Sequence, residues 1–181
     1  MASNQLNEAI LNVVSGKGDL RDVARTAGCS LDELESETRL RFAQAVESRN
    51  SEDLELICLL RGLLNASLVP GTREQQIRTC EILCNQDWHI LQEDIMRELQ
   101  SFAAPSSVVP IQSAISLKPR LAHLTYDDYG SFYKKCLWAL AAIGTEEAIS
   151  AIASYVTSSD NALAEEAVYR LNRIQNQSQK G

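Results

Sequence analysis

Apolar residues recur three and four positions apart through most of the chain and rarely alternate with polar ones. This spacing is the period of an α-helix. Residues that can cap a helix start stand before several of these stretches: Ser30, Ser51, Thr72, Asp87 and Thr145. The pattern therefore predicts an all-α chain with helices near residues 4–15, 19–27, 31–48, 52–66, 73–85, 88–102, 107–117, 131–143, 146–157 and 161–174.

The last six predicted helices form three pairs that repeat one arrangement of apolar residues. The first helix of each pair carries a triplet: Ile77, Cys80, Cys84, then Val108, Ile111, Ile115, then Ile149, Ile152, Val156. The second helix carries a quartet: Leu91, Ile95, Leu99, Phe102, then Phe132, Cys136, Leu140, Ile143, then Leu163, Ala167, Leu171, Ile174. Equivalent positions recur after 31 residues, or after 41 where a 10-residue insertion lies between the two helices of the middle pair. A shared register of this kind predicts an α-solenoid of stacked helical hairpins.

The most regular stretch is Cys136-Leu-Trp-Ala-Leu-Ala-Ala-Ile-Gly-Thr-Glu-Glu-Ala-Ile149, where one helix ends at Gly144 and the next begins after Thr145. Together with residues 158–171 it resembles HEAT repeats, in particular those of short bacterial HEAT-like proteins. The resemblance covers about residues 73–175 and implies an α-α superhelix of three hairpins with an insertion at about 118–130. The first hairpin departs from the pattern, because Ala103-Ala104-Pro105 stands where a Gly-Thr turn is usual.

Residues 1–67 are predicted to form a four-helix amino-terminal region. Residues 20–39 resemble the helix-turn-helix of lactose-repressor-type regulators, with the small Ala24, Gly28 at the turn and Ser30 as a cap. The second helix, however, carries four carboxylates that would repel DNA phosphates: Asp32, Glu33, Glu35 and Glu37. We therefore expect a hairpin that packs on the next helix. Helix 52–66 is apolar around much of its circumference, so we expect it to pack between the amino-terminal helices and the solenoid. Residues 1–181 are therefore predicted to form a single domain, with the best internal boundary at 68–72.

Composition narrows the possible functions. The 181-residue chain has 24 acidic and 17 basic residues, which gives a formal charge of -7. This charge disfavours general nucleic-acid binding and favours a basic partner. The five cysteines sit at helical apolar positions, and only Cys80 and Cys84 are close, with His89 the nearest histidine, so we expect reduced core thiols and no metal site. No apolar run is long enough for a membrane helix and the start lacks a signal-peptide pattern, which predicts a cytoplasmic protein.

The chain shows no recognised catalytic motif, so we expect a protein that is not an enzyme and has no cofactor. Binding residues are expected instead in the insertion, at Tyr126, Asp127, Asp128 and Tyr129. Tyrosines offer a large contact area with few torsions, and aspartates attract Arg or Lys. The alternative is that Asp127 or Asp128 caps helix 131–143 and the tyrosines pack locally.

A second predicted patch comprises Trp88, Glu93 and Asp94, next to Asp87 and Glu98. Trp88 is equivalent to Tyr129 by the 41-residue interval. Segment 51–101 contains nine acidic and four basic residues and thus holds most of the negative charge. The alternative for these charges is an ordinary solvated helix face.

These observations predict a protein-binding α-solenoid. Among small acidic bacterial proteins that resemble HEAT repeats one recurring role is immunity, so the resemblance implies that the chain neutralises a cognate, basic toxin by covering its surface. The alternatives are nucleic-acid binding, through residues 20–39 or along the solenoid, and a HEAT-like lyase or chaperone helper.

Overall fold

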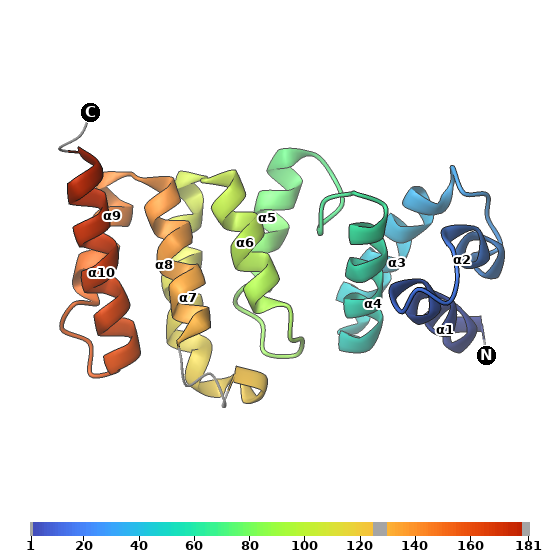
Figure 1. Ribbon diagram of the computed structural model, residues 1–181, viewed down its shortest axis with the longest axis horizontal. Coiled ribbons are helices and arrows are strands. Elements are labelled where there is room, and N and C mark those ends of the chain that lie inside the picture. The colour runs from blue at the N-terminus through green and yellow to red at the C-terminus, as the bar shows by residue number, and fades with distance from the viewer. Residues whose placement is uncertain (1, 125–129, 179–181) are drawn as a thin grey trace. The chain divides into compact units, whose positions relative to one another are not determined.

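The computed structural model describes residues 2–124 and 130–178, and every regular element in them is a helix (Figure 1). This confirms the all-α prediction. The ten α-helices of these residues are α1 (Ala2–Val14), α2 (Leu20–Ala27), α3 (Leu34–Ser48), α4 (Ser51–Leu63), α5 (Arg73–Leu83), α6 (Gln92–Phe102), α7 (Val108–Leu117), α8 (Ser131–Ile143), α9 (Glu146–Ser154) and α10 (Asn161–Ser178). Three short 3₁₀ helices, η1 (Pro105–Ser107), η2 (Lys118–Arg120) and η3 (Ala122–Leu124), flank α7. None of the described helices is long and apolar enough to cross a membrane.

Each of the ten predicted helices corresponds to an observed one, and two of them begin at least three residues later than predicted. Residues 31–33 form a turn closed by hydrogen bonds to the third preceding residue, from Glu33 N–H to the Ser30 carbonyl at 3.2 Å and from Leu34 N–H to the Leu31 carbonyl at 3.3 Å. The α-helix therefore starts only at Leu34. Similarly, α6 starts at Gln92, not at residue 88.

The prediction of a helix cap is wrong for two residues, Asp87 and Ser51. Asp87 does not cap α6, because residues 87–90 form bends and the Gln92 side chain is buried, with its Nε2 donating to the Gln86 carbonyl at 2.7 Å. Ser51 is already helical, and the cap of α4 is Asn50, whose side-chain oxygen accepts the Asp53 N–H at 3.2 Å.

The other three predicted caps form hydrogen bonds of the expected kind. Thr145 caps α9 by accepting the Ala148 N–H at 3.2 Å. The Thr72 N–H donates to Gln75 Oε1 at 2.8 Å, and the Gln75 N–H donates back to Thr72 Oγ1 at 3.4 Å. Ser30 makes the same reciprocal pair with Glu33, across the turn that precedes α3.

Close backbone contacts divide the chain into two compact units. Unit 1 comprises the residues up to Gln76 together with Trp88–Ile90, and unit 2 comprises Ile77–Asp87 and the residues from Leu91 onward. In unit 1, α1 packs on α2 and α4, and α3 packs on α4. Its core includes Leu6, Ile10, Leu34, Phe42 and Leu54. The prediction of a single domain stays a prediction.

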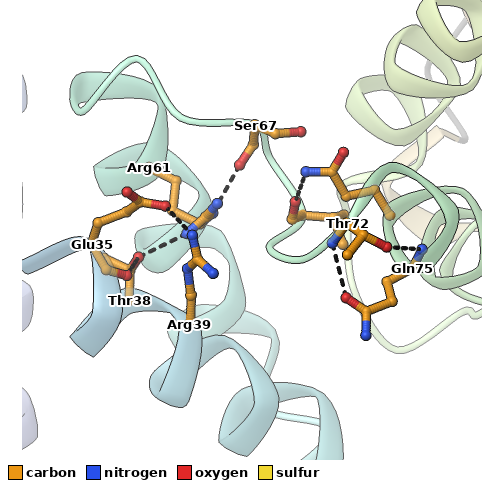
Figure 2. A network of polar contacts seen from close by, with 9 residues as sticks. Glu35, Thr38, Arg39, Arg61, Ser67, Thr72 and Gln75 are labelled. Carbon is orange, nitrogen blue, oxygen red and sulfur yellow. Dashed lines mark hydrogen bonds and ion pairs between the residues drawn. The ribbon is translucent and has the colours of Figure 1, made fainter.

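A buried arginine joins two helices of unit 1 to the turn after α4. Arg61 is only 2% exposed; its Nη1 donates to Thr38 Oγ1 at 2.9 Å and its Nε donates to the Ser67 carbonyl at 2.8 Å (Figure 2). Thr38, on α3, in turn donates to the Glu35 carbonyl at 2.7 Å. The polar atoms that burial removes from water are thereby paired within the protein.

In unit 2 the second helices of the predicted pairs lie side by side: α8 packs on α6 and on α10 (Figure 1). The first helices α7 and α9 also contact each other, and α8 packs on both of them. Near the end of α5, Glu81 Oε1 accepts hydrogen bonds from Ser106 at 2.7 Å and Ser107 at 2.8 Å, just before α7. The core includes Ile95, Ile111, Phe132, Leu140 and Ile152, each fully buried.

Candidate binding surfaces

Four of the predicted binding residues, Tyr126, Asp127, Asp128 and Tyr129, lie outside the described residues. Described residues before and after them contact each other in unit 2. The Lys118 ammonium lies over the Tyr133 ring, 4.3 Å from its centre, and the Tyr133 hydroxyl donates to Asp160 Oδ2 at 2.8 Å. These residues, with Pro119, Leu121 and Leu124, line an open hollow of about 260 Å³.

Glu93 joins two helices. It lies in the first turn of α6, where one carboxylate oxygen pairs with the Lys135 ammonium of α8 and the other accepts a hydrogen bond from Ser131 at 3.1 Å. The ion pair is about 30% exposed on either side. The charge of Glu93 is therefore compensated within unit 2, which is a structural role that its sequence position did not indicate.

Asp94, the next residue on α6, faces solvent. It pairs with Arg97 at 3.0 Å, and 44% of the Asp94 side chain and 68% of the Arg97 side chain remain exposed. Exposed pairs of this kind contribute little to stability, so Asp94 can exchange Arg97 for a cation of another protein at small cost.

Trp88 belongs to unit 1, whereas Glu93 and Asp94 belong to unit 2. The Trp88 ring meets the ring of His89 edge-on, with centres 4.8 Å apart and planes at 86°. His89 is buried and Trp88 is half-buried, so much of the Trp88 surface is already packed.

The thiols are mostly buried, as the sequence predicted. Cys58, Cys80, Cys84 and Cys136 are buried, and Cys29 is half-buried. Burial, reinforced by nearby Glu81, raises the pKa of Cys84 to about 12, and burial also raises the pKa of Cys136 well above its usual range. Both thiols are thus protonated and poor nucleophiles at neutral pH. The described residues contain no group of three or more His, Cys, Asp or Glu side chains that could hold a metal ion.

The segment that resembles a helix-turn-helix forms two helices, α2 and α3. Gly28 takes the left-handed conformation at the end of α2, with φ 74°, and Ala24 is buried. Two of its carboxylates are stabilised in the charged form: hydrogen bonds from the Ser30 backbone and side chain lower the pKa of Glu33, and the Arg39 guanidinium, 2.7 Å away, lowers the pKa of Glu35. Asp32, Glu33 and Glu35 are all exposed. Their charge opposes approach to DNA phosphates.

Sequence reasoning missed a hollow on the helix layer of α6, α8 and α10. It is open, has a volume of about 470 Å³, and is lined by Gln100, Trp138, Ala141, Ala142, Tyr169, Arg170 and Arg173. Trp138 is 45% exposed and Tyr169 is 51% exposed, which is unusual for large aromatic side chains. We call this set of residues the α8–α10 hollow.

A polar cluster holds the two aromatic rings of the α8–α10 hollow. The Arg170 guanidinium lies 4.8 Å from the centre of the Trp138 ring and 5.4 Å from that of Tyr169. Arg170 also pairs with Glu166 at 2.6 Å, and Glu166 accepts the Trp138 indole N–H at 3.2 Å. Burial raises the pKa of Glu166 in spite of Arg170, and burial lowers the pKa of Arg170. Desolvation thus outweighs the attraction within this pair.

The repeat register contained a signal for this hollow. Trp138 follows Phe132 by six residues, and Tyr169 follows the equivalent Leu163 by six residues. Both aromatics therefore occupy the same repeat position, one that falls outside the apolar quartet. An exposed position that is aromatic in two successive units is the pattern that could have identified the surface.

Comparison of the chain with protein-family models, with curated proteins and with solved structures finds no match. Inference about its function therefore rests on its own residues.

Proposed function

We propose that the chain is a non-enzymatic protein-binding α-solenoid of three HEAT-like hairpins. The burial of the repeat positions in the first two pairs supports this. Both triplets of these pairs are buried, as are Ile95, Leu99, Phe132, Cys136 and Leu140 of the quartets. The side-by-side packing of α6, α8 and α10 supports it too, since stacked second helices are what a solenoid requires.

The proposed partner is a basic protein, such as a toxin domain that the chain neutralises by covering its surface. The observation that carries this proposal is the acidic excess of segment 51–101. It has nine acidic residues against four basic ones, and the excess persists in the fold, because Arg61 is only 2% exposed while Glu93 is compensated by Lys135. A basic surface would be attracted to it.

Binding to the product of the adjacent gene tests this function. We expect the purified full chain to bind that product and to rescue cells in which it is expressed. The charge-reversed variant Asp94→Lys/Glu98→Lys should bind at least about tenfold more weakly, because both positions lie on one side of α6, four residues apart.

A matched control separates a local surface from net charge. The variant Glu146→Lys/Glu147→Lys makes the same change in charge at two exposed residues of α9. It should retain most of the affinity. An adjacent product that neither binds nor harms the cell would overturn the toxin proposal, and equal loss in the two double variants would overturn the assignment to α6.

A further inference from the structure

We infer that the α8–α10 hollow is a docking site for a segment of another protein that presents an apolar side chain beside carboxylates. The acidic residues of the proposed function, Asp94 and Glu98, do not line this surface, and its charge preference is the opposite. It lies entirely on helices of unit 2.

The apolar part of the hollow is made of aromatic carbon. The indole N–H, the only polar group of the Trp138 side chain, already donates to Glu166, so the exposed part of the ring offers carbon surface to a partner. The small Ala141 and Ala142 also line the hollow, which leaves room for an aliphatic or aromatic side chain against Trp138 and Tyr169. Exposed Trp and Tyr of this kind are enriched at the centres of protein interfaces.

The rings are fixed before any partner arrives. Arg170 stacks on Trp138 and Tyr169 while its guanidinium is tied to Glu166 at 2.6 Å. Cation–π contacts and the ion pair together restrict the rotamers of both aromatics. A partner therefore does not have to order these side chains on binding, which removes part of the usual entropic cost of association.

The charge of the hollow selects carboxylates. The charged side chains that line it are Arg170 and Arg173. Glu166 compensates Arg170, whereas Arg173 is exposed and has no ion pair within 4.0 Å among the described residues. The Arg173 guanidinium can therefore pair with a group of the partner, and a carboxylate matches its geometry and charge.

A peptide segment fits the hollow better than a nucleic acid. Exposed aromatics beside arginines also suit stacked bases, but the phosphates of a long strand would meet the overall charge of -7. A short acidic segment of a protein brings few charges and places them next to Arg173. The observations therefore favour the protein segment.

Selection from a random peptide library displayed on phage tests this inference, with the full-length chain as bait. We expect enriched sequences that combine Leu, Phe or Trp with neighbouring Asp or Glu. A synthetic peptide of the enriched sequence should bind at least about tenfold more weakly to Trp138→Ala and to Arg173→Glu. Tyr169→Ala gives a second test of the aromatic part if Trp138→Ala does not fold.

Two controls carry matched changes on helices that do not line the hollow. Val109→Ser removes an exposed apolar side chain from α7, and Arg78→Glu reverses an exposed charge on α5; both should bind the peptide like the wild type. Absence of enrichment, enrichment of basic sequences, or equal loss in the controls would overturn the inference. The inference would also be overturned if single-stranded oligothymidine bound the chain, if Trp138→Ala weakened that binding, and if no peptide bound. The proposed function can fail without affecting this result, because Asp94 and Glu98 do not line the hollow.

Discussion

Arg61 shows how one buried charge can organise a helical unit. A guanidinium removed from water is costly unless its donors are paired, and here two of them meet Thr38 Oγ1 and the Ser67 carbonyl. The second contact fixes the chain just after α4, so the arginine holds α3, α4 and the following turn together (Figure 2). Replacing it should cost more than losing one hydrogen bond, because Thr38 would remain buried.

We predict that Arg61→Met lowers the free energy of unfolding by about 2–4 kcal/mol, through loss of two charge-assisted hydrogen bonds, one of them to the buried Thr38. Urea unfolding measures this as a lower midpoint at an unchanged slope. Arg39→Met is the control, since Arg39 forms an exposed pair with Glu35, 55% and 48% exposed, and should cost less than about 1 kcal/mol. Equal costs for the two variants would contradict the structural role of Arg61.

Glu166 gives a residue-scale prediction for pH dependence. Because burial raises its pKa above the ordinary value of 4.5, the folded chain binds this proton more tightly than the unfolded chain. The stability that the raised pKa of Glu166 contributes is therefore fully present below the ordinary pKa, and it is lost as the pH rises through the raised pKa. We expect the free energy of unfolding of Glu166→Gln to improve relative to wild type as the pH rises across this window.

Urea unfolding of both proteins between about pH 4 and pH 7 checks the sign of this effect. Glu165→Gln, which removes an exposed carboxylate one position earlier on α10, controls for the change in net charge. If the two variants showed the same pH dependence, the burial of Glu166 would not be its cause.

At the scale of elements, the sequence predicted all ten described helices because each buries an apolar stripe with helical spacing. The starts of α3 and α6 were predicted too early. At α3 a turn with hydrogen bonds to the third preceding residue occupies residues 31–33, and at α6 the buried Gln92 bonds back to Gln86; helix propensity encodes neither feature. The α8–α10 hollow was missed for a related reason: Trp138 and Tyr169 look like further apolar residues until the packing shows them exposed.

The cap of α4 shows that residue type alone does not identify a capping residue. Ser51 is a good capping residue by type, but Asn50 has the extended backbone of a cap and accepts the Asp53 N–H. We expect Asn50→Ala to lower the free energy of unfolding by about 1 kcal/mol. Ser51→Ala, which removes a hydrogen bond from Ser51 to Glu55, should cost less than about 0.5 kcal/mol. Chemical denaturation of the two variants decides between these residues, and the reverse order would restore Ser51 as the cap.

At the scale of the whole molecule, the charge of -7 is distributed unevenly. Burial of Arg61 removes one positive charge of segment 51–101 from the surface, and the ion pair of Glu93 with Lys135 compensates one of its carboxylates, so the acidic excess of the segment is unchanged. The α8–α10 hollow, lined by two arginines, is an exception to the acidic character of the chain. We therefore propose that two surfaces of opposite charge preference bind two different segments.

This distribution predicts how association with a basic partner depends on salt. Long-range attraction raises the association rate constant and is screened at ionic strengths where the Debye length falls below about 10 Å. We therefore expect the association rate constant for the adjacent gene product to fall severalfold between about 50 and 300 mM NaCl, with a smaller change in the dissociation rate constant. Stopped-flow or surface-based kinetics on the full chain measures both constants.

The variants of α6 and α9 show which charges act locally. Both Asp94→Lys/Glu98→Lys and Glu146→Lys/Glu147→Lys change the net charge from -7 by the same amount, so each should reduce long-range steering to a similar degree. Only the α6 variant should also raise the dissociation rate constant, because only its carboxylates would touch the partner. An association rate constant that does not respond to salt would contradict a basic partner, and a dissociation rate constant raised equally by both variants would move the contact away from α6.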